Sequence, residues 1–177
     1  MLDLKRIIVQ DTNPSSAAGC FSYTKSLQKI ILKDGITSLP ANMFSSNDAL
    51  RYIRVPSTVT SLSTNALNCG NQLRFVRFES INPPSLASSL TVPVNQGIII
   101  PYDSVTSYMT KTNYPSASKY RIGFGTFNIG ETLPSQSTDG NYNITWYNTL
   151  PNAISQVAAG VINVGTGTEI YCRYTAV

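Results

Sequence analysis

Apolar and polar residues alternate over short stretches in the first half of the chain, and the same pattern returns every 23 residues. The stretch at residues 4–9 has counterparts at 27–32, 50–55 and 73–78. Each copy has a leucine, two variable residues, an isoleucine or valine, one variable residue and a further apolar residue. Because successive side chains of a strand point to opposite faces, each copy is predicted to be a short strand with one buried face.

Apolar positions also stay in register from one copy to the next, both in these strands and in the segments between them. The columns are Leu4/Leu27/Leu50/Leu73, Ile7/Ile30/Ile53/Val76, Val9/Leu32/Val55/Phe78, Phe21/Phe44/Leu67, Ile36/Val59 and Leu39/Leu62. Several columns at one spacing are typical of a solenoid. One copy is too small to bury its own apolar side, so neighbouring copies must stack and share a core. We therefore predict a mainly β solenoid, in which parallel strands stack and short helical or irregular segments return between them.

The repeat is interrupted at residues 81–84, where Pro83 and Pro84 cannot donate ladder hydrogen bonds. A related strand is predicted at 97–101, a short helix at 104–111 and a closing segment at 114–122. Short single helical turns are predicted in the return segments, at 42–45 and 65–68. This part of the chain, residues 1–123, is interpreted as one solenoid domain.

Residues 124–177 do not follow the repeat and are interpreted as a small C-terminal β module. A loop is predicted at 132–141 and strands at 142–147, 160–164 and 169–176. A piece of this size is marginal for independent folding. We expect it to pack on the end of the solenoid or on copies of itself.

The sequence of the third repeat resembles the repeat pattern of a known family. Its residues are Leu50, Ile53, Val55, Pro56, Ser57, Val59, Thr60, Ser61 and Leu62, followed by Leu67, Asn68, Cys69 and Leu73. This order is similar to that of the BspA-like leucine-rich repeat family, and residues 82–84 with 98–108 are similar to its C-terminal closing unit. The resemblance covers about residues 1–123. Two positions depart from the pattern, since Leu67 replaces the usual Phe and Tyr114 the usual Trp, but both keep bulk.

That resemblance implies a leucine-rich-repeat fold and a role in surface adhesion, or in protein or glycan binding, in bacteria and their phages. It implies no conserved chemistry.

The composition of the chain bears on whether it folds and on which partners it can have. Charged residues make up 12% of the chain and hydrophobic residues 42%, which supports a folded core. The net charge of +4 contains no block of like charges, so we expect no nucleic-acid partner. No apolar stretch reaches about 18 residues, so no membrane span is expected.

The chain has no histidine, which removes the commonest general base and the commonest transition-metal ligand. Its 9 acidic residues are scattered, without a spacing that pairs two carboxylates for glycoside hydrolysis. Gly123 and Gly125, like Gly165 and Gly167, lack the rest of a dinucleotide-binding fingerprint and are interpreted as turn glycines. We therefore expect a non-enzymatic protein with no catalytic residue, no metal site and no cofactor.

The cysteines and the first residues bear on the cellular compartment. Cys20, Cys69 and Cys172 have no CxxC spacing, and an odd number cannot be fully paired within the chain, so they are interpreted as small buried apolar residues. The start shows no charged segment followed by an apolar run. Either a signal peptide is missing from this sequence or the protein leaves its cell without one, as a phage virion protein would.

The outward positions of the strand stack are the candidate binding surface. One outward column contains Arg6, Lys29, Tyr52 and Phe75, and the next contains Ile8, Ile31, Arg54 and Arg77. Cations beside aromatic rings can hold an acidic or sugar partner through charge, stacking and cation–π contacts. We predict Arg6, Lys29, Tyr52, Arg54, Phe75 and Arg77 as partner-binding residues. The alternative is a solvated face whose aromatic rings only fill gaps between strands.

The N-terminal end of the stack is expected to contact another molecule. Only three residues precede the first strand, so no polar cap is expected on its edge. Ile8 and Ile31 add outward apolar surface at this end and are predicted as oligomer contacts. The possible covers are another chain, a preceding domain or the C-terminal module folding back, and we prefer another chain in a homo-oligomer or virion.

These observations favour a binding or adhesion module that recognises a protein or glycan at a bacterial surface, as an adhesin or a phage tail component. The alternative is a structural virion or assembly subunit that uses the solenoid only as a scaffold. Either would place the protein outside the cell, on a bacterial surface or in a phage virion.

Overall fold

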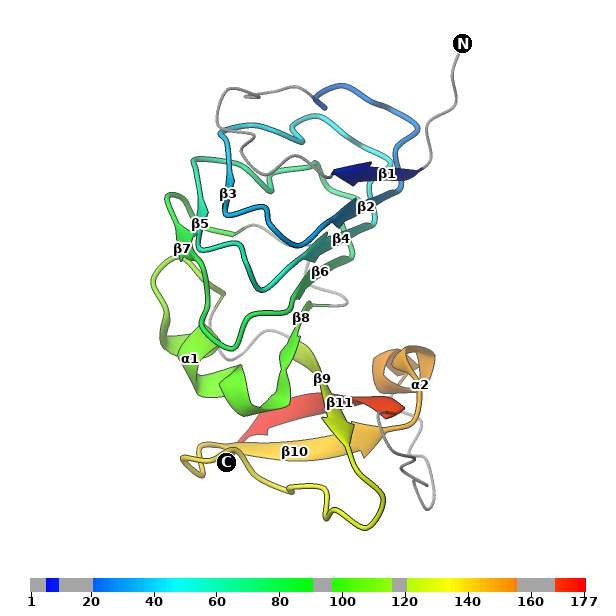
Figure 1. Cartoon of the computed structure of the whole chain (residues 1–177), viewed down its shortest axis with the longest axis vertical. Coiled ribbons are helices and arrows are strands. Elements are labelled where there is room, and N and C mark those ends of the chain that lie inside the picture. Colours follow the sequence, from blue (N-terminus) through cyan, green and yellow to red (C-terminus); the bar gives the residue numbers. More distant parts are fainter. Residues whose placement is uncertain (1–5, 10–20, 91–96, 116–120, 156–167) are drawn as a thin grey trace.

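One long sheet runs through the whole molecule. The structure, a computed structural model, describes residues 6–9, 21–90, 97–115, 121–155 and 168–177, without the side chains of residues 6–9 and 121. Its eight-stranded sheet has the order β1-β2-β4-β6-β8-β9-β11-β10. These strands are β1 (Arg6–Val9), β2 (Lys29–Leu32), β4 (Tyr52–Val55), β6 (Phe75–Phe78), β8 (Ile98–Pro101), β9 (Arg121–Phe127), β11 (Thr168–Ala176) and β10 (Tyr142–Tyr147). In Figure 1 the repeats stack from β1 at the top to β8, and the C-terminal strands lie below.

The strands of the repeats pair in the predicted register. From β1 to β9 all neighbours are parallel, and Ile7 pairs with Ile30, Ile30 with Ile53 and Ile53 with Val76. The 23-residue columns of the sequence are therefore columns in the sheet. The prediction of a mainly β solenoid is confirmed.

The core fills the space between the strand stack and the return segments. The predicted core residues Leu27, Leu50, Leu73, Ile30, Ile53, Val76, Leu32, Val55, Phe78, Phe44, Leu67, Ile36, Val59, Leu39 and Leu62 are all buried. Phe21 is partly buried and stacks on Phe44, with ring centroids 5.9 Å apart. The remaining members of the columns, Leu4, Ile7 and Val9, lie outside the described side chains.

The return segments form a second, smaller sheet that was not predicted. It consists of β3 (Ser38–Leu39), β5 (Ser61–Leu62) and β7 (Ser85–Leu86), all parallel. The segments at 42–45 and 65–68 are hydrogen-bonded turns, closed by Ser45 N to Asn42 O at 3.1 Å and Asn68 N to Asn65 O at 3.0 Å. Both asparagines have positive φ, 54° and 55°, a conformation that asparagine tolerates better than most residues.

Buried polar side chains join neighbouring repeats. Asn47 is fully buried: its Oδ1 accepts hydrogen bonds from Thr24 N and Oγ1, and its Nδ2 donates one to Phe21 O. Three hydrogen bonds therefore tie this side chain to the preceding repeat. The Thr58 hydroxyl similarly accepts from Gly35 N and donates to Ile36 O. These bonds fix the register of the repeats in addition to the ladder itself.

A short helical segment closes the last repeat. The 3₁₀ helix η2 (Tyr102–Ser104) leads into α1 (Val105–Thr110), which matches the helix predicted at 104–111. The buried Tyr108 donates its hydroxyl to Ser80 O at 2.8 Å, and Tyr114 donates to Pro84 O at 3.0 Å. The two tyrosines thus anchor the closing unit to the segment where prolines interrupt the repeat.

The C-terminal strands extend the sheet of the solenoid. β9 crosses the boundary drawn at 123/124 and pairs in parallel with β8 and antiparallel with β11. The strands predicted at 142–147 and 169–176 are β10 and β11. The strand predicted at 160–164 lies outside the described residues. α2 (Leu150–Ser155) was not predicted.

The interpretation of Gly123 and Gly125 as turn glycines is wrong, because both lie inside β9. A Cβ atom on Gly123 would come within 2.8 Å of Ile100 O, and one on Gly125 within 2.8 Å of the Tyr102 ring. Neither position leaves room for a side chain, since real Cβ contacts are longer than this. These glycines therefore serve close packing rather than a turn.

The cysteines in the described residues behave as predicted. Cys69 and Cys172 are buried and form no disulfide, and burial raises the pKa of each thiol to about 12. They are small core residues. Cys20 lies outside the described residues.

Candidate functional site

The outer face of β2, β4 and β6 contains three of the predicted binding residues side by side. Lys29 pairs with Tyr52 and Tyr52 with Phe75, so the three form one row across the strands. The Lys29 ammonium lies 5.2 Å from the centroid of the Tyr52 ring, within the range of a cation–π contact. Lys29 is exposed and both rings are half-buried. We call these three residues the aromatic row.

The Tyr52 hydroxyl stays protonated at neutral pH. Burial raises the pKa of Tyr52, and the nearby guanidinium of Arg77 offsets only part of this rise. The tyrosine is therefore available as a neutral hydrogen-bond donor and a stacking surface.

The two predicted arginines of the next column are engaged within the chain. Arg54 donates from Nε to Glu79 Oε1 at 2.8 Å and from Nη1 to Leu32 O at 2.7 Å. Its Nη2 donates to Glu79 Oε2 and approaches Asp34 Oδ1 at 3.4 Å. Burial alone would lower the pKa of Arg54, but the bond to Glu79 raises it overall.

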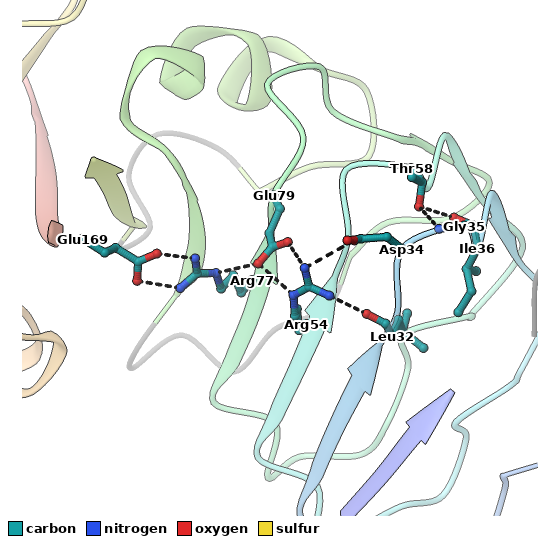
Figure 2. A network of polar contacts seen from close by, with 9 residues as sticks. All are labelled: Leu32, Asp34, Gly35, Ile36, Arg54, Thr58, Arg77, Glu79 and Glu169. Carbon is teal, nitrogen blue, oxygen red and sulfur yellow. Dashed lines mark hydrogen bonds and ion pairs between the residues drawn. The ribbon is translucent and has the colours of Figure 1, made fainter. Parts of the chain in front are cut away.

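Arg77 joins the repeats to the C-terminal module. Its Nη1 and Nη2 donate to the two carboxylate oxygens of Glu169 in β11, at 2.9 and 2.6 Å, and its Nε lies 3.3 Å from Glu79. The guanidinium carbon also lies 4.0 Å from the centroid of Phe124 in β9. Burial would raise the pKa of Glu169, but the bond from Arg77 lowers it overall. Figure 2 shows the resulting chain of ion pairs from Glu169 through Arg77, Glu79 and Arg54 to Asp34.

The predicted site thus divides into two kinds of residue. Lys29, Tyr52 and Phe75 face outward together. Arg54 and Arg77 lie in the same surface, but their charges are matched by carboxylates, and their side chains are only 23% and 15% exposed. The side chain of Arg6 lies outside the described residues, although its backbone pairs with Lys29 as predicted.

Two exposed arginines next to the aromatic row were missed from the sequence. Arg51 and Arg74 precede Tyr52 and Phe75, and the backbone bond from Arg74 N to Arg51 O, at 3.0 Å, sets them in neighbouring repeats. Within the described residues neither makes an ion pair, nor does Lys29. Their 23-residue spacing was an available signal, but the two columns predicted to face outward did not include them. We call Lys29, Arg51 and Arg74 the cationic rim.

The helix α2 limits how far this face extends. Ile99 pairs with Arg77 and with Ile122, so the outward column becomes apolar at β8. Ile99 and Ile122 are buried in one cluster with Tyr147 of β10 and Ala153 of α2. Arg173 donates to the carbonyls of Ala153 and Ile154 and so holds this helix. Phe75 of β6 packs at the edge of this cluster, so the open part of the outer face lies over β2 and β4 and ends at β6.

The predicted oligomer contacts lie near the other end of the sheet. Ile8 pairs with Ile31, whose side chain is half-buried, while the side chain of Ile8 lies outside the described ones. The described C-terminal strands occupy the opposite end of the sheet and do not cover β1. Contact of Ile8 and Ile31 with another chain stays a prediction.

Comparison with known proteins agrees with this architecture. A parallel strand stack with a 23-residue repeat defines a leucine-rich-repeat solenoid. Residues 1–87 match the family model of the BspA type leucine rich repeat region (6 copies), and this region of the chain belongs to that family. No curated protein and no solved structure matches the chain.

The family supports a coarse functional class. Repeats of this type form protein-interaction or adhesion modules, are typically associated with surfaces and are typically non-enzymatic. In the described part of the chain, no helix has the length and apolar character needed to cross a membrane.

Proposed function

We propose that this protein is a non-enzymatic binding module that holds an acidic protein or glycan at a bacterial surface, through the aromatic row and the cationic rim. The observation that carries this proposal is the arrangement over β4 and β6. Two aromatic rings lie half-buried in a row. Lys29 contacts one of them, and the exposed Arg51 and Arg74 directly precede them in the chain; none of these three cations has an ion-pair partner in the described residues.

The physical basis is a preorganised surface. Tyr52 and Phe75 are on paired strands of a packed sheet, so little conformational entropy remains to be lost when a partner covers them. Aromatic rings and arginines are enriched among residues that dominate binding energy. The rim charges attract an anionic partner, and this attraction weakens as salt screens it.

The ion pairs of Arg54 and Arg77 support the surface in a different way. Their guanidinium groups are held by Glu79 and Glu169, so they keep the strands aligned beside the aromatic row. A role of these two arginines in binding stays a proposal.

More specifically, the proposed role is attachment to a host or to a bacterial surface, for example as a component of a phage tail. The alternative is a structural virion or assembly subunit, and the half-buried Ile31 near the β1 edge favours contact between chains. Solution mass separates the two, because an assembly subunit forms oligomers without any other partner.

Charge reversal of the rim is expected to weaken binding strongly. The measurement is binding of the labelled protein to an immobilised panel of acidic and neutral glycans and bacterial surface proteins. The triple variant Lys29→Glu, Arg51→Glu, Arg74→Glu should lose at least about tenfold in affinity for acidic members, which corresponds to about 1.4 kcal/mol.

The matched control is Lys111→Glu, an exposed lysine next to α1 and away from the rim. It should bind as the unaltered protein does. Equal affinity of the rim variant and the control variant would show that the outer face is not the binding surface.

A further inference from the structure

A pocket lies between η2 and the segment that follows β9, outside the proposed binding face. Its volume is about 440 Å³, within the roughly 300–1,000 Å³ of typical small-ligand sites. Tyr102 and Phe127 supply its aromatic wall, and Asp103, Glu131, Gln136 and Thr138 supply polar groups. In Figure 1 the chain after β9 turns below the sheet and runs back to the start of β10.

The aromatic wall is rigid. Tyr102, Phe127 and Trp146 pack on one another with ring centroids 5.1 to 5.5 Å apart. The Trp146 indole N–H donates to Pro134 O at 2.7 Å, which ties the wall to the pocket loop. Gly125 has no Cβ at a place where one would come within 2.8 Å of both rings of Tyr102 and Phe127. The rings therefore reach their positions only because residue 125 is glycine.

The pocket loop is fixed as well. Asp139 accepts hydrogen bonds from Ser137 Oγ and from Thr106 Oγ1 of α1, each at 2.7 Å. The carboxylate of Glu131 accepts from Asn128 N and Nδ2, both at 2.9 Å. Two carboxylates thus hold the loop in shape before any ligand arrives, which lowers the entropic cost of binding.

Polar groups remain available around the opening. Asp103 is exposed and makes no hydrogen bond or ion pair in the part of the chain that the structure describes. Tyr102, Asp103 and Glu131 line the same pocket. Burial raises the pKa of Tyr102, and the charges of Asp103 and Glu131 raise it further, so the phenol keeps its proton. Thr138 adds a donor as well as acceptors, and Gln136, whose Nε2 donates to Asn143 Oδ1 at 3.3 Å, keeps a second N–H and its carbonyl oxygen.

From this arrangement we infer that the pocket is a binding site for a neutral saccharide. A tyrosine face packs against the C–H face of a sugar ring, while sugar hydroxyls donate to the carboxylates and accept from Gln136 and Thr138. A cation would use the acceptors only, whereas the donors of Gln136 and Thr138 also fit the hydroxyl oxygens of a saccharide. An anionic sugar would be repelled by Asp103 and Glu131. The site therefore differs in charge preference from the cationic rim, and it goes beyond the function proposed above.

The test is titration with neutral oligosaccharides of hexose and N-acetylhexosamine, with sialylated and uronic-acid oligosaccharides, and with choline as a cationic probe. The chain has one tryptophan, Trp146, which packs on Tyr102, so its fluorescence reports on the pocket. We expect neutral members to bind and to change this fluorescence, and acidic members and choline to bind at least tenfold more weakly.

Asp103→Asn and Gln136→Ala should each weaken neutral-saccharide binding at least tenfold without changing the melting temperature. Asp48→Asn, an exposed carboxylate in the second repeat, is the control for charge and should have no effect. The rim triple variant should also keep this binding, which separates failure of this site from failure of the proposed function. Preferential binding of choline, absence of any neutral ligand, or unchanged affinity in Asp103→Asn would overturn the inference.

Discussion

Leu50→Asp is expected to unfold the solenoid. Leu50 is fully buried, with the equally buried Leu27 and Leu73 at the same position in the repeats before and after it. Burial of a leucine side chain contributes roughly 1.5–3 kcal/mol, and an unpaired buried carboxylate costs more than that. Because a domain is stable by only about 5–15 kcal/mol, the combined loss removes most or all of the free energy of unfolding. Circular dichroism during heating measures the result.

Two further variants make this prediction specific. Leu50→Ala should lower the free energy of unfolding by about 2–5 kcal/mol and leave a folded protein. Ser57→Asp introduces the same charge at an exposed position of the same repeat and should cost little. An unchanged melting temperature for Leu50→Asp would mean that the 23-residue register is wrong.

Gly123→Ala is expected to disrupt the junction between the repeats and the C-terminal module. An added Cβ would lie 2.0 Å from the Tyr174 hydroxyl and 2.8 Å from the backbone oxygen of Ile100 in β8. Since both contacts are far below normal separations, β8, β9 and β11 must shift. Overpacking of this kind costs about 1–3 kcal/mol, and a backbone neighbour leaves little room for relaxation. The measurement is the shift of the urea midpoint.

A double-mutant cycle with Tyr174→Leu tests the stated cause. Removal of the tyrosine ring frees the space that the new methyl group needs, so Gly123→Ala should cost less in the Tyr174→Leu background. A coupling energy of about 0.5–3 kcal/mol is expected for residues in contact. Additive effects would show that the two side-chain positions do not compete for space.

The repeats could be predicted from the sequence because stacking places each copy in the same environment. A core position such as Ile30 is repeated at Ile53 and Val76, so each column is supported by several residues. The C-terminal module offers no such repetition, so its loop at 132–141 and its strongly alternating strands could be predicted but α2 could not. The interpretation of Gly123 and Gly125 as turn glycines was wrong. A Gly-x-Gly sequence locally favours a turn, but packing against Ile100 and Tyr102 is what requires glycine at these positions.

The site was predicted only in part for a similar reason. Column order placed Lys29, Tyr52 and Phe75 in one row, since outward positions obey the same spacing as the core. The partner of Arg77 is Glu169, 92 residues away in a part of the chain without the repeat. The 23-residue spacing therefore could not predict the contact between Arg77 and Glu169. The pocket between η2 and the segment after β9 could not be predicted for the same reason, because it is formed by Tyr102 and by a loop about 30 residues later.

The central claim is that the outer face over β2, β4 and β6 contacts the partner. Hydroxyl-radical footprinting, with and without the tightest-binding acidic member of the panel, measures the accessibility of individual side chains there. We expect Lys29, Tyr52 and Phe75 to lose reactivity in the complex, while Tyr23 and Ile129, both 74% exposed and away from the aromatic row, keep theirs. Protection of other side chains, with Lys29, Tyr52 and Phe75 as reactive as in the free protein, would contradict the account.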